Sequence, residues 1–215
     1  MEPLEKRSQN YGWRDNREHW HVRNLGPFIA EFLRRNQCQK ILDLGCGNGA
    51  LAARLEAEGF SVTGVDPDEQ GVAIAREHCN GQFLVASCYD DPLELGLTGF
   101  DAVICLEVVE HLYWPDAAVH FARKALKDSG WLILSTPYHG YLKNLCMSLL
   151  NRWDRHWNPL RRGGHIKFFS RRTLTLLVER NGFDVIYWHG IGRLPGLWKS
   201  MVVYARQNPG SSPSR

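Results

Sequence analysis

Four side chains in this sequence could perform chemistry on a bound substrate: Glu107, Glu110, His111 and His165. The first three form the pattern E-x-x-E-H directly after an apolar run at 100–106, and the fourth lies in the segment G-G-H-I-K-F. If a helical turn begins at Glu107, the two carboxylates and the imidazole share one face. Such a set could bind a divalent ion, with His165 as a fourth ligand from the far side of the site. Without an ion, His111 is the first candidate for a general base and His165 the second.

A second group of residues, nearer the N-terminus, could hold a ligand. Asp43 is followed by glycines at positions 45, 47 and 49, which allow the backbone to turn sharply and to approach a ligand closely. Asp66 closes the next apolar run, where an acid can accept hydrogen bonds from both hydroxyls of a ribose. Asp43 should face the same crevice, and its charge suits a ligand with an ammonium group better than one with a pyrophosphate.

An alternation of strands and helices would bring these residues to one edge of a parallel sheet. Apolar runs predict strands at 41–44, 61–65, 82–86, 100–106, 131–135, 185–189 and 200–205. Helical spacing predicts helices at 20–35, 50–58, 72–78, 115–126 and 173–181, the last with Ser170 as its N-cap. A short Gly/Pro turn joins the last two strands, so they should pair antiparallel. The predicted fold is α/β: a Rossmann-like, doubly wound, seven-stranded sheet, mostly parallel, with an antiparallel last strand.

Two stretches of the sequence resemble a known family. D-L-G-C-G-N-G-A at 43–50 resembles the first motif of the class I S-adenosylmethionine-dependent methyltransferases, and F-D-A-V-I-C-L-E-V-V-E-H-L at 100–112 resembles their fourth strand and the loop after it. The glycines also satisfy the loose dinucleotide-binding pattern, but an antiparallel terminal hairpin is typical of the methyltransferases and not of the dehydrogenases. The resemblance therefore implies S-adenosylmethionine as the cofactor.

The same resemblance implies roles for particular residues. Asp43 would help to hold the methionine end of the cofactor, Asp66 would hold the ribose, and the backbone of Leu106 would lie beside the cofactor. Family members often carry Gly-Asp-Ala after the third strand, whereas this chain has Ala-Ser-Cys at 86–88, so Ser87 replaces the acid, and either its hydroxyl or Asp90 reaching back must take over the contact. The N-terminal aromatic and basic residues are expected to cap the cofactor from the other side. The implied cofactor-binding residues are Asp43, Gly45, Cys46, Gly47, Asn48, Gly49, Asp66, Pro67, Ser87, Cys88 and Leu106, with Arg23 as a candidate partner for the cofactor carboxylate.

The later histidine narrows the resemblance. E-x-x-E-H followed by such a histidine occurs in the O-methyltransferases of ubiquinone biosynthesis and in small-RNA 3′-terminal 2′-O-methyltransferases, although methyltransferases that use no metal also carry E-x-x-E-H. A divalent metal such as Mg²⁺ is thus a second candidate cofactor. The pattern is closest to the ubiquinone group and favours O-methylation of a small phenolic or quinol-like acceptor. The alternatives are methylation of an RNA 3′ end or a sugar, an NAD-binding oxidoreductase, and a non-catalytic cofactor-binding protein.

Length and composition predict one domain. The chain has 215 residues, of which 44% are hydrophobic and 23% charged, enough for one sizeable core. We expect a methyltransferase domain over 1–208, with an N-terminal cap helix region at 1–36, a helical lid insertion at 138–167, and a disordered tail at 209–215. The six cysteines are scattered without a C-x-x-C, and the start of the chain lacks an apolar signal core, so we expect a cytoplasmic protein.

Positive charge is concentrated in and after the expected insertion. Eight Lys or Arg and one acid, Asp154, lie within 143–172, a net charge of 8 − 1 = +7 in a chain whose total is +3. Trp153 and Trp157 lie there among leucines, a composition that suits the surface of an anionic membrane. The expected partners are a small-molecule acceptor and, as a candidate, an anionic membrane surface to which the protein would bind peripherally. Nucleic acid is less favoured, and the sequence indicates no oligomeric state.

Overall fold

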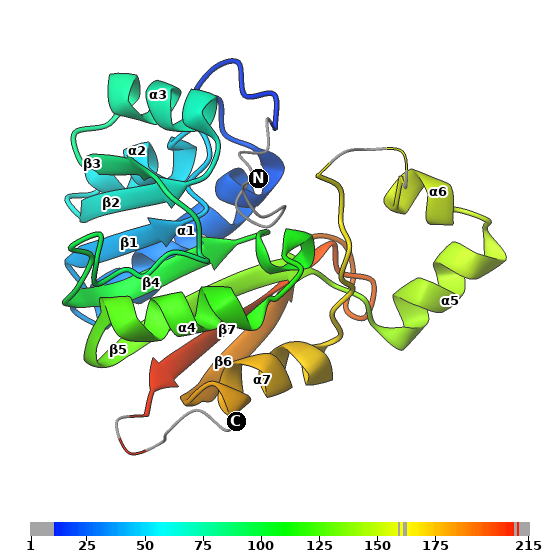
Figure 1. The fold of residues 1–215 in the computed structure, drawn as a ribbon. Coiled ribbons are helices and arrows are strands. Elements are labelled where there is room, and N and C mark those ends of the chain that lie inside the picture. The colour runs from blue at the N-terminus through cyan, green and yellow to red at the C-terminus, as the bar shows by residue number, and fades with distance from the viewer. Residues whose placement is uncertain (1–10, 159, 161–162, 209, 211–215) are drawn as a thin grey trace.

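A sheet of seven strands forms the centre of the molecule (Figure 1). The computed structural model describes residues 11–158, 160, 163–208 and 210. The strands are β1 (Lys40–Leu44), β2 (Ser61–Asp66), β3 (Gln82–Val85), β4 (Phe100–Leu106), β5 (Leu126–Pro137), β6 (Phe183–Ile191) and β7 (Ser200–Gln207). Their spatial order is β3-β2-β1-β4-β5-β7-β6, and β7 runs in the direction opposite to the other six strands. The predicted, mostly parallel sheet with an antiparallel last strand is confirmed.

Helices cover both faces of this sheet (Figure 1). They are α1 (Trp20–Arg35), α2 (Ala50–Ala57), α3 (Glu69–His78), α4 (Asp116–Ala125) and α7 (Arg171–Arg180). Successive side chains of a strand point to opposite faces, so β1 contributes to two cores. Ile41 packs in the core with α1, α2 and α3, whereas Leu42 and Leu44 pack in the core with α4 and α7. Helices on both faces leave the carboxyl edge of the parallel strands as the place where side chains can meet a ligand.

Polar caps determine where two helices begin. The side chain of Asp68 accepts a hydrogen bond of 3.0 Å from the backbone N–H of Gly71, so α3 begins at Glu69 and not at the expected position 72. Ser170 caps α7 as predicted and forms a capping box with Thr173. The first of these caps lies directly after β2, at the edge of the sheet where the acid Asp66 ends the strand.

The helical turn expected to begin at Glu107 is shorter than predicted. Glu107 has a left-handed backbone with φ of 55°, and the turn that follows is a 3₁₀ helix over Val109–His111. A left-handed residue cannot continue a right-handed helix, so Glu107 does not belong to the turn that carries Glu110 and His111. The expectation of one shared helical face therefore fails for Glu107.

The insertion at 138–167 is helical, with α5 (Tyr141–Leu149) and α6 (Trp153–His156). Both helices stand out from the sheet on the right of Figure 1. None of the helices in the described ranges combines the length and the hydropathy needed to span a bilayer. The predicted disordered tail, except Gly210, and residues 1–10 of the cap region lie outside the described residues.

Candidate functional site

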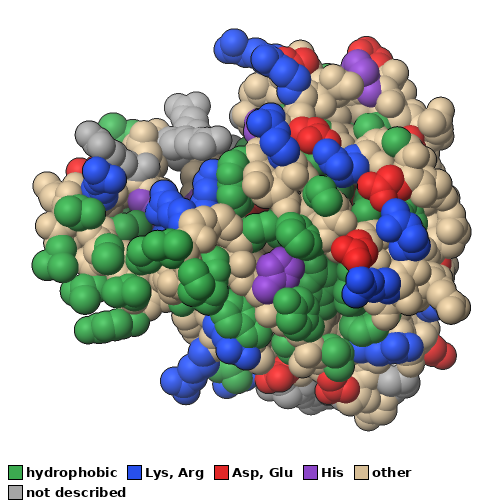
Figure 2. Space-filling model, turned by 180° about the vertical axis from the view of Figure 1, so that it is seen from behind, with side chains coloured by type: hydrophobic (Ala, Val, Ile, Leu, Met, Phe, Trp, Pro, Cys, Tyr) green, Lys and Arg blue, Asp and Glu red, His purple; other side chains and the backbone are tan. Residues whose placement is uncertain are grey.

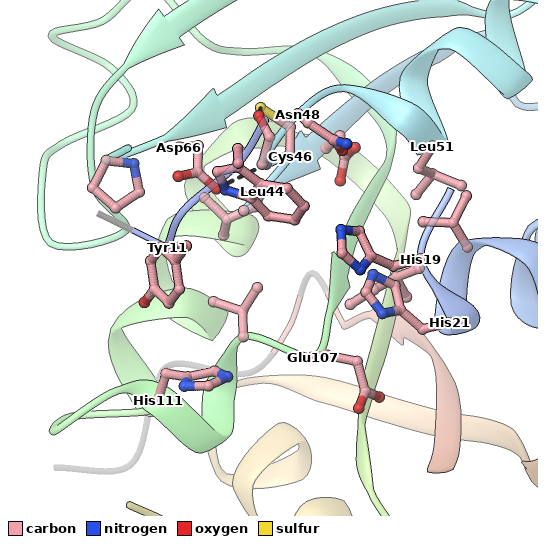
Figure 3. A pocket seen from close by; sticks show the side chains of 18 of the residues that line it. Tyr11, His19, His21, Leu44, Cys46, Asn48, Leu51, Asp66, Glu107 and His111 are labelled. Atoms are coloured by element: carbon pink, nitrogen blue, oxygen red, sulfur yellow. Dashed lines mark hydrogen bonds between the residues drawn. The ribbon is translucent and has the colours of Figure 1, made fainter. Parts of the chain in front are cut away.

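A cavity of about 550 Å³ lies at the carboxyl ends of β1, β2 and β4 (Figure 3). Ligands bind at this edge in open α/β sheets. Its walls come from the glycine turn after β1, the end of β2, the loops after β3 and β4, and the residues before α1. Of the residues singled out from the sequence for the cofactor, the following line it: Asp43, Gly45, Cys46, Gly47, Asn48, Asp66, Pro67, Ser87, Cys88 and Leu106.

The turn after β1 requires glycine at two positions for space as well as for backbone conformation. Gly45 has φ of 86°, and a Cβ there would lie 2.3 Å from the side chain of Val108. Gly47 has φ of 51°, and a Cβ there would lie 2.4 Å from the ring of Trp13. Gly49, with φ of 75°, packs closely against α3 and is not part of the cavity lining. Two of the three glycines therefore shape the cavity, and the third allows α2 and α3 to approach each other.

Asp66 is fixed by backbone donors on two sides. Its Oδ2 accepts a hydrogen bond of 2.9 Å from the N–H of Gly47, and its Oδ1 accepts one of 2.8 Å from the N–H of Asp68. Burial nevertheless raises the pKa of the Asp66 carboxyl to about 6. Each carboxylate oxygen has lone pairs left for a ligand, so this rigid acid can accept hydrogen bonds from vicinal hydroxyls.

Asp43 differs from Asp66 because one of its oxygens lacks a donor. The side chain is 2% exposed, and its Oδ2 has no hydrogen-bond partner among the described residues. Burial, and then the neighbouring charge of Asp66, raise the pKa of the Asp43 carboxyl to about 7. Buried polar atoms are almost always paired in proteins. This oxygen therefore indicates a ligand that brings its own donor, such as an ammonium group.

The loop after β3 has a serine, Ser87, where family members often carry an acid, and a hydrogen bond to an acid three residues later stabilises its turn. The nearby Asp90 accepts a hydrogen bond of 2.8 Å from the N–H of Ser87, which ties the acid to the turn. Ser87 and Cys88 line the cavity, whereas Asp90 does not. In this segment the residues that can touch a ligand are therefore Ala86, Ser87 and Cys88.

The N-terminal wall of the cavity differs from the expectation in one residue. The apolar face of α1, with Val22 and Leu25, packs into the core, which leaves Arg23 exposed and outside the cavity lining. Trp13 and His21 line the cavity instead, and burial lowers the pKa of the His21 imidazole to about 4. The sequence analysis did not single out His21, although the run H-W-H at 19–21 was a visible signal.

Three of the four candidate metal ligands converge at one end of the cavity. The Nε2 atoms of His111 and His165 lie 4.0 Å and 3.9 Å from Oε1 of Glu110, and one ligand atom from each residue lies within 4.8 Å of the others. Glu110 is 1% exposed, and its Oε1 has no hydrogen-bond partner in the described part of the chain. Burial, and then the nearby carboxylate of Glu107, raise the pKa of the Glu110 carboxyl well above its usual range. His111 and His165 line the cavity, and so does Glu107, whereas the buried Glu110 is not among the lining residues.

Glu107 lies apart from this cluster for a reason that follows from strand geometry. Its Oε1 accepts hydrogen bonds from the hydroxyls of Ser135 and Ser200, whereas Oε2 of Glu110 accepts one of 3.0 Å from Thr136. Ser135 and Thr136 are consecutive in β5, so they point to opposite faces of the sheet. The two glutamates therefore bind on opposite sides of β5, and the observed cluster contains Glu110, His111 and His165 without Glu107.

Hydrogen bonds bring His165 to the cluster across a long stretch of chain. The backbone N–H groups of Ile166 and Lys167 donate to the carbonyl of Glu110 at 2.8 and 3.0 Å. The indole N–H of Trp157 donates to the carbonyl of His165 at 2.9 Å. His165 is the one described residue of the insertion that lines the cavity. These contacts therefore fix the position of the residue through which the insertion reaches the site.

Comparison with known proteins places the chain in a family. A family described as "Methyltransferase domain" matches residues 13–187. The chain is 30% identical to the ubiquinone biosynthesis O-methyltransferase of Chromobacterium violaceum over 192 residues, which are 85% of this chain and 82% of that protein. It is 38% identical to the protein of the same name from Idiomarina loihiensis over 157 residues, 71% of this chain and 65% of that one.

Solved structures share the fold. A protein from Pyrococcus horikoshii superimposes with a TM-score of 0.68 at 22% identity, over 87% of this chain and 90% of its own. Magnesium protoporphyrin IX methyltransferase from Synechocystis, solved with bound S-adenosylhomocysteine, gives a TM-score of 0.63 at 18% identity, over 91% and 90%. Because the family match covers most of the sequence, including the glycine turn and the acids Asp43 and Asp66, the chain belongs to the class I S-adenosylmethionine-dependent methyltransferases.

Proposed function

We propose that this methyltransferase transfers the methyl group to a hydroxyl oxygen of a small phenolic or quinol-like acceptor. The observation that carries the proposal is the cluster of Glu110, His111 and His165, whose two histidines line the cofactor cavity. A hydroxyl acceptor needs a base or a metal ion to lower its pKa, and this cluster can supply either. Two relatives that carry the name ubiquinone biosynthesis O-methyltransferase support this acceptor class.

The cofactor half of the cavity would orient the reacting groups. Oδ2 of Asp43 would accept a hydrogen bond from the cofactor ammonium, and Asp66, held by Gly47 and Asp68, would accept hydrogen bonds from the ribose hydroxyls. The methyl group is already activated on the positively charged sulfur, so the protein has mainly to align the acceptor oxygen, the methyl carbon and the sulfur. The oxygen forms the new bond to carbon, the pair of the C–S bond returns to sulfur, and the hydroxyl proton leaves to a base.

The Glu110 cluster fits a divalent ion. Oε1 of Glu110 lacks a partner among the described residues, and two imidazole nitrogens lie within reach of the same point. Two imidazoles and one carboxylate are more typical of Zn²⁺, Mn²⁺ or Fe²⁺ than of Mg²⁺, which prefers oxygen ligands. A bound ion would polarise the acceptor oxygen. In a mechanism without an ion, the imidazole of His111 or His165 accepts the hydroxyl proton.

The test is an acceptor panel assayed with metal-free and metal-loaded protein. The panel contains catechols, monophenols, a quinol, and an RNA with a free 3′ end as the alternative acceptor. We expect methylation of catechol or quinol oxygens, loss of activity after chelation, and recovery with Mn²⁺ or Zn²⁺. Full activity after chelation would assign the role to an imidazole base alone. Product on RNA only, or on none of the hydroxyl acceptors, would contradict the proposal.

Cofactor affinity is expected to rise with pH because of the buried acids. The pKa of Asp43 lies at about 7 and that of Asp66 at about 6. Protonation of Asp43 removes its attraction for the ammonium, and protonation of Asp66 makes it a weaker acceptor for the ribose hydroxyls, so each unit of pH below about 7 should weaken binding by up to about tenfold. Calorimetric titration with S-adenosylhomocysteine across this range measures the effect. D43N should bind weakly with a flatter pH profile, whereas D91N, which changes an exposed acid, should behave like the wild type.

The outer surface of the insertion favours contact with an anionic membrane. Large apolar side chains gather on the projecting insertion in Figure 2, among them Tyr141, Leu149 and Leu160, which are 84%, 76% and 90% exposed. Exposed apolar groups beside basic residues suit a lipid interface. The basic stretch is not wholly exposed, because Lys143 is 3% exposed and its Nζ donates to the carbonyl of Tyr138 at 2.6 Å.

Flotation with anionic liposomes tests this surface. We expect the wild type to float at low salt and the L149E/L150E variant to remain in the dense fraction. The two new carboxylates disfavour burial in the lipid and are repelled by the negatively charged headgroups. L93E is the matched control, since Leu93 is also exposed, at 55%, but lies outside the insertion. A wild type that does not bind at low salt, or equal loss in both variants, would contradict a membrane role for the insertion.

A further inference from the structure

The segment before α1 forms a wall of the cofactor cavity. We call residues 11–18 the N-terminal strap; seven of them, all except Asn16, line the cavity. Figure 3 shows Tyr11 of the strap, and His19 directly after it, among the side chains around the cavity. The strap has no regular secondary structure of its own, so its position depends on contacts with the rest of the domain.

Asn48 of the glycine turn makes two of these contacts with one buried side chain. Its side chain is 3% exposed, and its Nδ2 donates to the carbonyl of Asp15 at 2.7 Å and to the carbonyl of Arg17 at 3.2 Å. Its Oδ1 accepts a hydrogen bond of 3.3 Å from the N–H of Ala50, at the start of α2. Both amide N–H groups of one side chain are thus used to hold the strap, and the oxygen holds the turn.

Two further contacts hold the strap on either side of Asn48. Glu18 accepts a pair of hydrogen bonds from Arg54 of α2, at 2.8 and 3.0 Å, in the two-pronged geometry that suits a guanidinium and a carboxylate. At the other end, the N–H of Tyr11 donates to Oδ2 of Asp68 at 2.7 Å. The strap is therefore bound to the glycine turn, to α2 and to the N-cap of α3, and all three adjoin the cofactor cavity.

Trp13 of the strap carries a donor that lacks an acceptor. Its ring lies against Gly47 and Gly71, where a Cβ would come within 2.4 and 2.8 Å of it. Its Nε1 is buried with no hydrogen-bond partner in the described residues, although the side chain lines the cavity. A buried indole N–H usually finds a partner. A cofactor bound in this cavity would bring carboxylate and ribose oxygens, which are hydrogen-bond acceptors.

We propose that Asn48 is a positioning residue that holds the N-terminal strap against the bound cofactor, and that Trp13 donates its indole N–H to that cofactor. The product S-adenosylhomocysteine then leaves the cavity only after the strap has moved. Asn48 acts through the strap, whereas Trp13 touches the cofactor. The inference concerns the cofactor alone and is independent of which acceptor is methylated.

The decisive variant is N48S. Serine can still accept the hydrogen bond from Ala50 within the turn, but its short side chain cannot donate to both strap carbonyls. We expect S-adenosylhomocysteine to dissociate about tenfold faster, the effect of losing about two buried hydrogen bonds that form only with the strap in place. Dissociation is followed after rapid mixing of the loaded protein with excess unlabelled ligand. N36S is the matched control, because Asn36 also donates to a backbone carbonyl, that of Phe32, but lies at the C-cap of α1, at the opposite end of this helix from the strap.

A second readout separates positioning from a general loss of stability. Hydrogen exchange in N48S should accelerate in the strap and remain unchanged in the sheet. R54M, which breaks the bond to Glu18 from another element, should give the same pattern with a smaller effect, and R34M, which breaks the surface pair with Glu58, should not. A wild-type dissociation rate in both N48S and R54M, or faster exchange spread over the whole domain, would overturn the role of the strap.

W13F tests the donor directly. Phenylalanine retains a ring against the two glycines but has no N–H, so we expect the dissociation constant for S-adenosylhomocysteine to rise about fivefold. Exchange in the strap of the ligand-free protein should remain as in the wild type. Unchanged affinity in W13F would overturn the contact with the cofactor, whatever the result for N48S.

Discussion

The H165A variant should lose methyl transfer to a hydroxyl acceptor by about 10²- to 10⁴-fold in kcat, the range for removing a positioned acid, base or metal ligand. His165 supplies one of the two imidazoles beside Oε1 of Glu110, at 3.9 Å, and it is held there by backbone contacts of its neighbours. Removing its ring leaves those backbone contacts intact, so the cavity should keep its shape. The affinity for S-adenosylhomocysteine, measured by calorimetry, should therefore remain unchanged.

The controls decide between a local and a general effect. His120 is exposed on α4, and H120A should retain the full rate. If H165A retained near wild-type kcat, the Glu110 cluster would have no part in acceptor activation. If H165A lost cofactor affinity as strongly as rate, His165 would belong to the cofactor site. An H165A protein that still binds Mn²⁺ tightly would indicate a base, whereas parallel loss of metal and rate would indicate a ligand.

The D66A variant should lose cofactor binding by about 100-fold or more. The carboxylate is proposed to accept two hydrogen bonds from the ribose, and a hydrogen bond to a charged group contributes about 1.5–3 kcal/mol. The same substitution removes the acceptors of Gly47 and Asp68, so the glycine turn also loses its support. Calorimetric titration with S-adenosylhomocysteine, with NADH in a parallel experiment, measures the loss and should show no NADH binding by the wild type.

Asp101 provides a matched control for D66A. Its Oδ2 accepts two backbone hydrogen bonds of 2.7 Å, from Gln39 and Lys40, at the opposite end of the sheet. D101A should therefore lower the stability of the fold without lowering the affinity for S-adenosylhomocysteine. Equal weakening in D66A and D101A would mean that Asp66 acts only by supporting the fold, and unchanged affinity in D66A would remove it from the cofactor site.

The sequence predicted those parts of the site that depend on neighbouring residues. The turn with Gly45 and Gly47 follows from local backbone requirements, and it lines the cavity as expected. The shared face of the E-x-x-E-H pattern was not predicted correctly, because the left-handed backbone of Glu107 depends on hydroxyls that β5 and β7 bring from far along the chain. Spacing along a helix cannot reveal such a tertiary constraint.

Arg23 illustrates the same limit on the N-terminal side. Its position on a helix was predicted correctly, but which face of that helix meets the sheet is decided by packing of Val22 and Leu25, and this leaves Arg23 exposed. Asn48 donates a hydrogen bond to the carbonyl of Asp15 in the strap. The residues around Asp15 form no helix or strand. Periodicity gives no information on such contacts, so the strap could be expected near the cofactor but not placed.

The position of β7 has a consequence for how the chain is synthesised. This strand is the last in sequence but lies between β5 and β6, so both neighbours have unpaired edges until it is made. Ser200, its first residue, also completes the bonding of Glu107 at the end of β4. A nascent chain whose β7 has not yet left the ribosome therefore has an incomplete sheet, and its Glu107, a residue of the cavity lining, lacks one of its hydroxyl partners. Folding to the active form must wait for translation of the last strand, and chains that terminate before it would expose two strand edges prone to aggregation.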